Sequence, residues 1–162
     1  MTYVCSKNGK FDTYDIDDNC DLNDLNEYFD IFFNVDTLMA SPVALLNQKG
    51  YITEMSCSGH FIKSICCDSY VQQSKPLNTL VEKSENDLIR CYSVENILDN
   101  KSFIRFRHNY NFSILPQKWK LVDNTYLYFE YEKDLTEFEF YIAQVQAIKN
   151  LYDWVETLKS IL

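Results

Sequence analysis

Residues 134–162 read DLTEFEFYIAQVQAIKNLYDWVETLKSIL, and this stretch has the clearest periodicity in the chain. Asp134 and Glu137 have the three-residue spacing of a capping box, in which two side chains bond free amides at a helix start. An apolar stripe at helical spacing follows, made of Phe138, Tyr141, Val145, Ile148, Tyr152, Val155 and Leu162. The stretch therefore predicts a long helix over residues 135–162.

This predicted helix has more apolar surface than one packing partner covers. Further apolar residues lie off the stripe: Phe140, Ile142, Leu151, Trp154 and Leu158. A helix that is apolar on more than one side is usually buried from more than one side. The stripe also contains two rows of period seven, as in a coiled-coil seam. We expect one face to cover a sheet and the other to meet a second subunit, as in a homodimer, or a partner protein.

The segments before this helix alternate between helical and strand patterns. Helical spacing in residues 21–36 predicts one helix. A second helix begins at Ser41-Pro42, with Ser41 as the cap and Pro42 in the first turn, and it ends at Gly50. Strands are expected at residues 51–56, 61–67, 88–94, 102–107, 119–122 and 125–131, the last two as a hairpin around Asp123-Asn124. The order predicts a single α+β domain with a mainly antiparallel sheet, two N-terminal helices and one long C-terminal helix.

Composition sets the broad class of the protein. The chain has 162 residues, of which 46% are hydrophobic and only three each are Gly and Pro, so a disordered or collagenous chain is excluded. No secretory signal or membrane-spanning run is evident. The six cysteines fit no disulfide framework, and together these features predict a cytoplasmic protein with reduced thiols.

Charge is distributed unevenly along the chain. The net charge is −9, and residues 1–36 contain nine acidic residues and two lysines. We therefore divide the chain into an acidic arm with a helix, residues 1–36, and an α+β core domain with the C-terminal helix, residues 37–162. At the other extreme, residues 101–120 have no acidic residue and interleave bases with aromatic side chains, which is typical of nucleotide or single-strand binding.

Residues 46–60 read LNQKGYITEMSCSGH and contain a recognisable pattern. With FIRF at 103–106 and LPQKW at 115–119, this stretch resembles small proteins of low-GC bacteria and their phages that have no assigned function. The resemblance covers residues 41–131 and implies a bacterial or phage context. It implies no activity.

The SCSG core at residues 56–59 is also similar to the Ser-Cys-Ser-Gly-Arg motif of the wybutosine-synthesis methyltransferase family. That family modifies tRNA with S-adenosylmethionine, and His60 stands here in place of the family's arginine. A strand that ends in small residues leaves free amides at a turn, where an anion can bind. The predicted ligand-binding residues are Ser56, Cys57, Ser58, Gly59 and His60, with Arg105 and Arg107 completing an anion pocket.

Two other chemistries are open at this turn. Cys57 and His60 have the spacing of a zinc knuckle, with Cys66 or Cys67 as a third ligand and Cys20 or Cys91 to complete the set. Alternatively, His60 activates Cys57 as a nucleophile. The sequence favours buried thiols that behave as small hydrophobic side chains, and we expect no cofactor, no metal and no catalytic residue.

The sequence favours a non-enzymatic binding protein over an enzyme. A strongly acidic face resembles nucleic acid and can block a basic nucleic-acid or defence enzyme of the host, as phage anti-defence inhibitors do. The predicted partner-binding residues are Asp17, Asp21, Asp24 and Asp30. Sequestration of a small ligand is the related possibility. The alternative is a nucleotide- or tRNA-binding, methyltransferase-like module centred on the Ser56–His60 turn.

Overall fold

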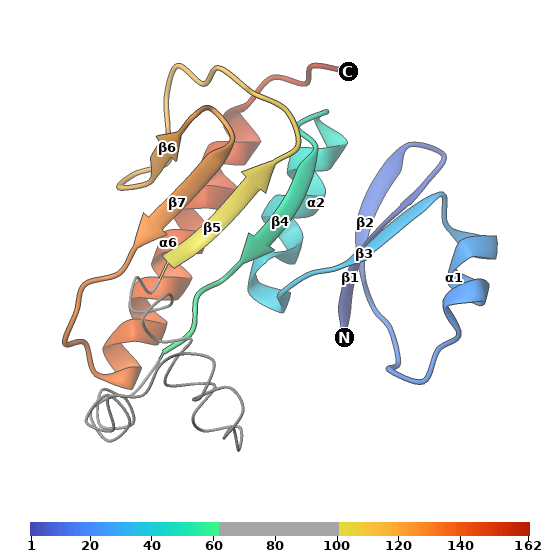
Figure 1. The fold of residues 1–162 in the computed structure, drawn as a ribbon, viewed down its shortest axis with the longest axis horizontal. Helices are drawn as coiled ribbons and strands as arrows, with labels where there is room; N and C mark the ends of the chain where they lie inside the picture. Colours follow the sequence, from blue (N-terminus) through green and yellow to red (C-terminus); the bar gives the residue numbers. More distant parts are fainter. Residues whose placement is uncertain (62–100) are drawn as a thin grey trace, which may run out of the picture.

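A computed structural model describes residues 1–61 and 101–162 and contains two antiparallel sheets and three α-helices within these ranges (Figure 1). Its elements are β1 (Thr2–Lys7), β2 (Lys10–Asp15), α1 (Leu22–Tyr28), β3 (Ile31–Asn34), the 3-10 turn η1 (Thr37–Met39), α2 (Ala40–Gln48), β4 (Thr53–Cys57), β5 (Lys101–Phe106), β6 (Lys120–Val122), β7 (Tyr126–Glu130) and α6 (Glu137–Thr157). The predicted α+β class is confirmed, with two helices in the N-terminal half and one long C-terminal helix.

The N-terminal sheet has the strand order β2-β1-β3. Asn8 and Gly9, both with positive φ, join β1 to β2, which is the geometry of a tight hairpin turn. Because side chains alternate along a strand, Val4 enters the main core while Cys5 packs on Leu25 of α1. This sheet therefore separates α1 from the rest of the molecule, at one end of the view in Figure 1.

The second sheet has the order β4-β5-β7-β6. Ile104, Phe106 and Leu127 point into the core that α2 and α6 cover. The predicted hairpin is confirmed, because Asp123 and Asn124 have positive φ and join β6 to β7. The predicted strands at 102–107 and 51–56 correspond to β5 and β4.

Helix α2 lies between the two sheets and beside α6 (Figure 1). It is buried on several sides because it packs on both sheets and on α6. Its end follows the prediction: Gly50 has φ +96°, the Gly50 amide donates to the Asn47 carbonyl and the Tyr51 amide donates to the Leu46 carbonyl. Its start differs, since η1 leads directly into the helix and Ser41 lies inside it rather than capping it.

The helix predicted for residues 21–36 is wrong beyond Tyr28. Asp21 caps α1 by accepting a bond from the Asn23 amide, but the chain then enters β3. The Asp30 amide donates to the Ser6 carbonyl, and Phe32 and Phe33 pair with β1. Pairing with β1 therefore overrides the helical spacing of these phenylalanines.

The bounds and the buried face of α6 also differ from the prediction. The cap is Thr136, which bonds the Glu139 amide and side chain, and Asp134 has a positive φ outside the helix. The helix ends at Thr157, so Leu162 is not part of it. Three members of the predicted stripe, Phe138, Tyr141 and Val145, are about half or more exposed. The buried residues are Phe140, Gln144, Ala147, Ile148, Leu151, Trp154 and Val155. Predicted strands at 61–67 and 88–94 fall mainly or wholly outside the described residues.

Candidate functional site

The Ser56–His60 turn begins with the last two residues of β4, which is an edge strand of the second sheet. Cys57 pairs with Phe103, and this register brings the next residue, Ser58, to Ser102 at the start of β5. Gly59 has φ +84°, and a Cβ atom there would lie 3.3 Å from both the Lys101 carbonyl oxygen and the Tyr131 ring. Only glycine fits this position without displacing its neighbours.

The backbone carbonyls of the turn are bonded from inside the protein. Ser102 Oγ donates to the Ser58 carbonyl at 2.6 Å, and Gln144 Nε2 from α6 donates to the Ser58 and Gly59 carbonyls at 2.6 and 2.9 Å. Ser102 Oγ also lies 2.6 Å from the Tyr131 hydroxyl. Burial raises the pKa of Tyr131 to about 12. This buried network holds the turn in one conformation.

Asp36 is a residue of the site that the sequence analysis missed. It lies between β3 and η1, and its Oδ2 accepts bonds from the Ser58 amide at 2.8 Å and from Ser58 Oγ at 3.2 Å. In the sequence it is one of nine acids in the arm, but in the structure it is half-buried against the turn. No local pattern indicates this contact, which joins residues 22 positions apart.

Cys57 and His60 meet beside this carboxylate. Cys57 Sγ lies 3.5 Å from His60 Nε2 and accepts a bond from the Gly59 amide at 3.4 Å. Burial and the nearby Asp36 carboxylate raise the pKa of Cys57, although the Gly59 bond opposes them. A raised pKa keeps the thiol protonated at neutral pH, which disfavours Cys57 as a nucleophile. One ligand atom from each of Asp36, Cys57 and His60 lies within 4.8 Å of the others.

The two arginines predicted to complete an anion pocket lie at different positions along β4, and only Arg105 is close in register to Ser56. Arg105 pairs with Met55 and its guanidinium lies 5.8 Å from the Tyr126 ring, while the Arg107 amide bonds the Ile52 carbonyl at the other end of β4. The Ser58 amide, expected to be free for an anion, already donates to Asp36. A carboxylate in that position repels an anion, so the arrangement is complementary to a cation.

The cysteines considered for a zinc set are distributed differently. Cys20 packs near α1 with Cys5 and Leu25, apart from the turn. Cys66, Cys67 and Cys91 lie outside the described residues. Within those residues, Asp36 is the group that joins Cys57 and His60.

Four of the aromatic residues of the basic stretch 101–120 have core roles. Phe106 and Trp119 are buried, and Trp119 Nε1 donates to the Ala147 carbonyl. Tyr110 and Phe112 pack against the same core. These four rings therefore support the sheet and α6. Phe103 instead lies on the other face of β5, half-buried, with its ring against Tyr126.

The four acids predicted to bind a partner are exposed and lie around the N-terminal sheet and α1. Three of them also have local roles, since Asp17, Asp21 and Asp30 accept bonds from the backbone amides of Asn19, Asn23 and Asn8. Their carboxylates are thus fixed in position, while Asp24 lies in the first turn of α1.

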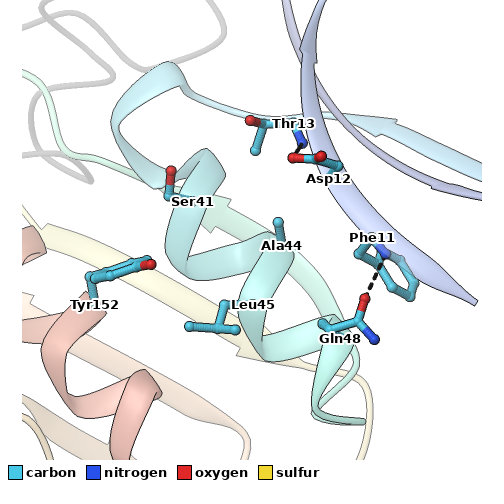
Figure 2. Close-up of a pocket in the computed structure, with 8 residues that line it drawn as sticks. All are labelled: Phe11, Asp12, Thr13, Ser41, Ala44, Leu45, Gln48 and Tyr152. Carbon is cyan, nitrogen blue, oxygen red and sulfur yellow. Dashed lines mark hydrogen bonds between the residues drawn. The ribbon is translucent and has the colours of Figure 1, made fainter.

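A separate hollow of about 200 Å³ lies between β2, α2 and α6 (Figure 2). The Phe11 amide donates to Gln48 Oε1 across it, and Asp12, its one carboxylate, bonds the Thr13 amide. The other lining residues are Ser41, Ala44, Leu45 and Tyr152. None of the predicted site residues lines this hollow.

Comparison of the chain with family models, with characterised proteins and with solved structures gives no match. The resemblances to phage-related proteins and to the methyltransferase family therefore stay expectations. No helix in residues 1–61 or 101–162 is long and apolar enough to cross a membrane.

Proposed function

We propose that this protein is a non-catalytic binding protein that covers the basic, nucleic-acid-binding surface of a partner protein, such as a host defence enzyme. The observation that carries the proposal is the charge of the N-terminal region. Residues 1–36 contain nine acids and two lysines, and every acid except Asp36 is exposed. A basic surface that binds phosphates attracts such a face through the same long-range field.

Exposed aromatic side chains lie among these acids and support binding to a protein. Tyr14 and Tyr28 are 41% and 60% exposed, and both pack their rings against Phe29. Tyrosines of this kind are enriched at protein interfaces, because they add apolar contact at little entropic cost. A merely solvated acidic surface has no need of them.

The fixed carboxylates add to this argument. Asp17, Asp21 and Asp30 are each bonded to a backbone amide, so they lose little freedom when a partner binds. Asn accepts the same bonds without the charge. Replacement of these three residues and Asp24 by Asn therefore tests charge with little effect on folding.

The experiment is affinity capture from a bacterial lysate, followed by identification and purification of the captured protein. We expect a nucleic-acid-binding partner whose complex weakens with salt and is displaced by duplex DNA or RNA. The four-Asn variant should bind it at least ~10-fold more weakly, because several charge pairs are lost.

The matched control replaces four exposed acids outside the acidic arm by Gln: Glu54, Glu130, Glu132 and Glu156. It removes the same charge and should retain binding. Equal weakening in both variants would show a nonspecific charge effect and contradict the proposal. A chain that binds tRNA or S-adenosylmethionine directly, with no protein partner, would favour the alternative module at the Ser56–His60 turn.

A further inference from the structure

The Ser56–His60 turn brings together three side chains whose chemistry suits a metal ion. Asp36, Cys57 and His60 supply an oxygen, a sulfur and a nitrogen from two segments of the chain. Thiolate and imidazole are the ligands that select zinc over calcium or magnesium, which prefer oxygen alone. Because the three atoms lie within 4.8 Å of one another, the folded chain holds most of the required geometry.

The spacing of the sulfur and nitrogen matches tetrahedral coordination. Zn–S bonds of about 2.3 Å and Zn–N bonds of about 2.0 Å at a tetrahedral angle place the two ligand atoms about 3.5 Å apart. Cys57 Sγ and His60 Nε2 are 3.5 Å apart. The Asp36 oxygen lies within 4.8 Å of both atoms, so a shift of at most about 1.5 Å gives it tetrahedral spacing.

The surroundings of the ligands support the same inference. Ser58 orients the Asp36 carboxylate through two hydrogen bonds, and the Gly59 amide donates to Cys57 Sγ. Such bonds position metal ligands in known sites. Gln144 and Ser102 hold the turn from the protein interior by donating to the Ser58 carbonyl. His60 is exposed, so an ion has a path from solvent.

We propose that Asp36, Cys57 and His60 bind one Zn²⁺ ion, with a water molecule in the fourth position. The ion joins the segment after β3 to the edge of the second sheet. It therefore couples the acidic N-terminal region to the core of the protein. The proposal does not depend on the nature of the partner.

The test is zinc titration of the full chain in reducing buffer against a chromophoric chelator, with Co²⁺ as a spectroscopic substitute. We expect one equivalent of zinc and a cobalt spectrum with a thiolate charge-transfer band and tetrahedral d–d bands. Cys57→Ser and His60→Gln should each weaken binding by about 100-fold or more. Asp36→Asn keeps an acceptor for Ser58, and it should weaken binding by at least about 10-fold.

Matched controls separate this site from other thiols and imidazoles. Cys20→Ser and His108→Gln should bind zinc like the unaltered chain. A variant with Cys66, Cys67 and Cys91 all changed to Ser should also bind it. Loss of binding in that triple variant, retention in His60→Gln, or a cobalt spectrum without a thiolate band would each overturn the three-residue site.

Discussion

Two glycine turns flank β4, and they differ in what their polar groups do. At one end, Gly50 ends α2, and the neighbouring Lys49 ammonium donates to the carbonyls of Val155, Glu156 and Leu158 at the end of α6. At the other end, Gly59 lies in a turn whose carbonyls are bonded by Gln144 of the same helix. Both turns thus attach β4 to α6.

The difference lies in the side chains that gather at each turn. Around Gly50, the ammonium of Lys49 is used by the helix end, and the Tyr51 hydroxyl donates to the Lys159 carbonyl. Around Gly59, Ser102 and Gln144 bond the carbonyls from inside. Asp36 and Cys57 accept bonds from the Ser58 and Gly59 amides, and they converge with His60 on the outer side. The contrast therefore lies in which side chains gather at each turn: the Gly59 turn brings together three possible metal ligands, whereas Lys49 at the Gly50 turn bonds the end of α6.

The largest expected effect is the loss of the buried support under the Gly59 turn. Gln144 is 4% exposed, and Gln144→Leu removes the donor that bonds two carbonyls. An unsatisfied buried carbonyl is costly, so the free energy of unfolding should fall by about 3 kcal/mol. Urea denaturation measures the change.

The matched control for this variant is Gln146→Leu, two residues along the same helix. Gln146 is exposed and bonds only Asn150 in the described contacts, so we expect a change within about 0.5 kcal/mol. Equal effects of the two variants would mean that the network under Gly59 adds nothing to stability.

A smaller loss is expected at the Gly50 turn. Lys49→Met removes a cation from three carbonyls at the negative end of α6, which should lower the free energy of unfolding by about 2 kcal/mol. Zinc binding at the Gly59 turn should stay unchanged, as measured by the zinc titration described above.

The control is Lys149→Met. Lys149 forms an exposed pair with Asp153, so its loss should lower the free energy of unfolding by at most about 0.5 kcal/mol. A zinc affinity that falls with Lys49→Met would show that the two turns are not independent.

The sequence predicts the Gly50 turn well because its signals are local. A proline in the first turn of α2, apolar residues at helical spacing and a terminal glycine all lie within ten residues, and the structure follows them. The same holds for the hairpin at Asp123-Asn124. The hairpin at Asn8-Gly9 had an equally local signal, which the sequence analysis did not use.

The Gly59 turn is predictable only in part, because tertiary contacts decide its chemistry. The small residues of the SCSG stretch indicate a turn, but Asp36 reaches it from another segment and accepts a bond from the Ser58 amide, which was expected to be free. Long-range contacts also explain the errors in element bounds. Residues 31–34 form a strand because they pair with β1. Beyond the end of α6, the Ile161 amide donates to the Lys49 carbonyl.

The smallest expected effect concerns the stability of the two turns at alkaline pH, where a tyrosine at each turn titrates. Burial raises the pKa of Tyr131 at the Gly59 turn to about 12, and burial and then Tyr110 raise the pKa of Tyr51 at the Gly50 turn. For both tyrosines the folded pKa exceeds the unfolded value of 10.0. The contribution of each hydroxyl to the free energy of unfolding is therefore present below about pH 10 and is lost as pH rises through the folded pKa.

Removing each hydroxyl distinguishes the two tyrosines. Tyr131→Phe and Tyr51→Phe should each cost about 1 kcal/mol near pH 7, because each loses one hydrogen bond. Above about pH 10, unfolding free energies from urea denaturation should fall less steeply in Tyr131→Phe than in the unaltered chain. Tyr51→Phe should change the slope less, since its hydroxyl meets the carbonyl of the exposed Lys159 whereas that of Tyr131 meets the buried Ser102. Equal slopes in the two variants would show that both turns exclude water to the same degree, and the distinction between them would then rest on the metal ligands alone.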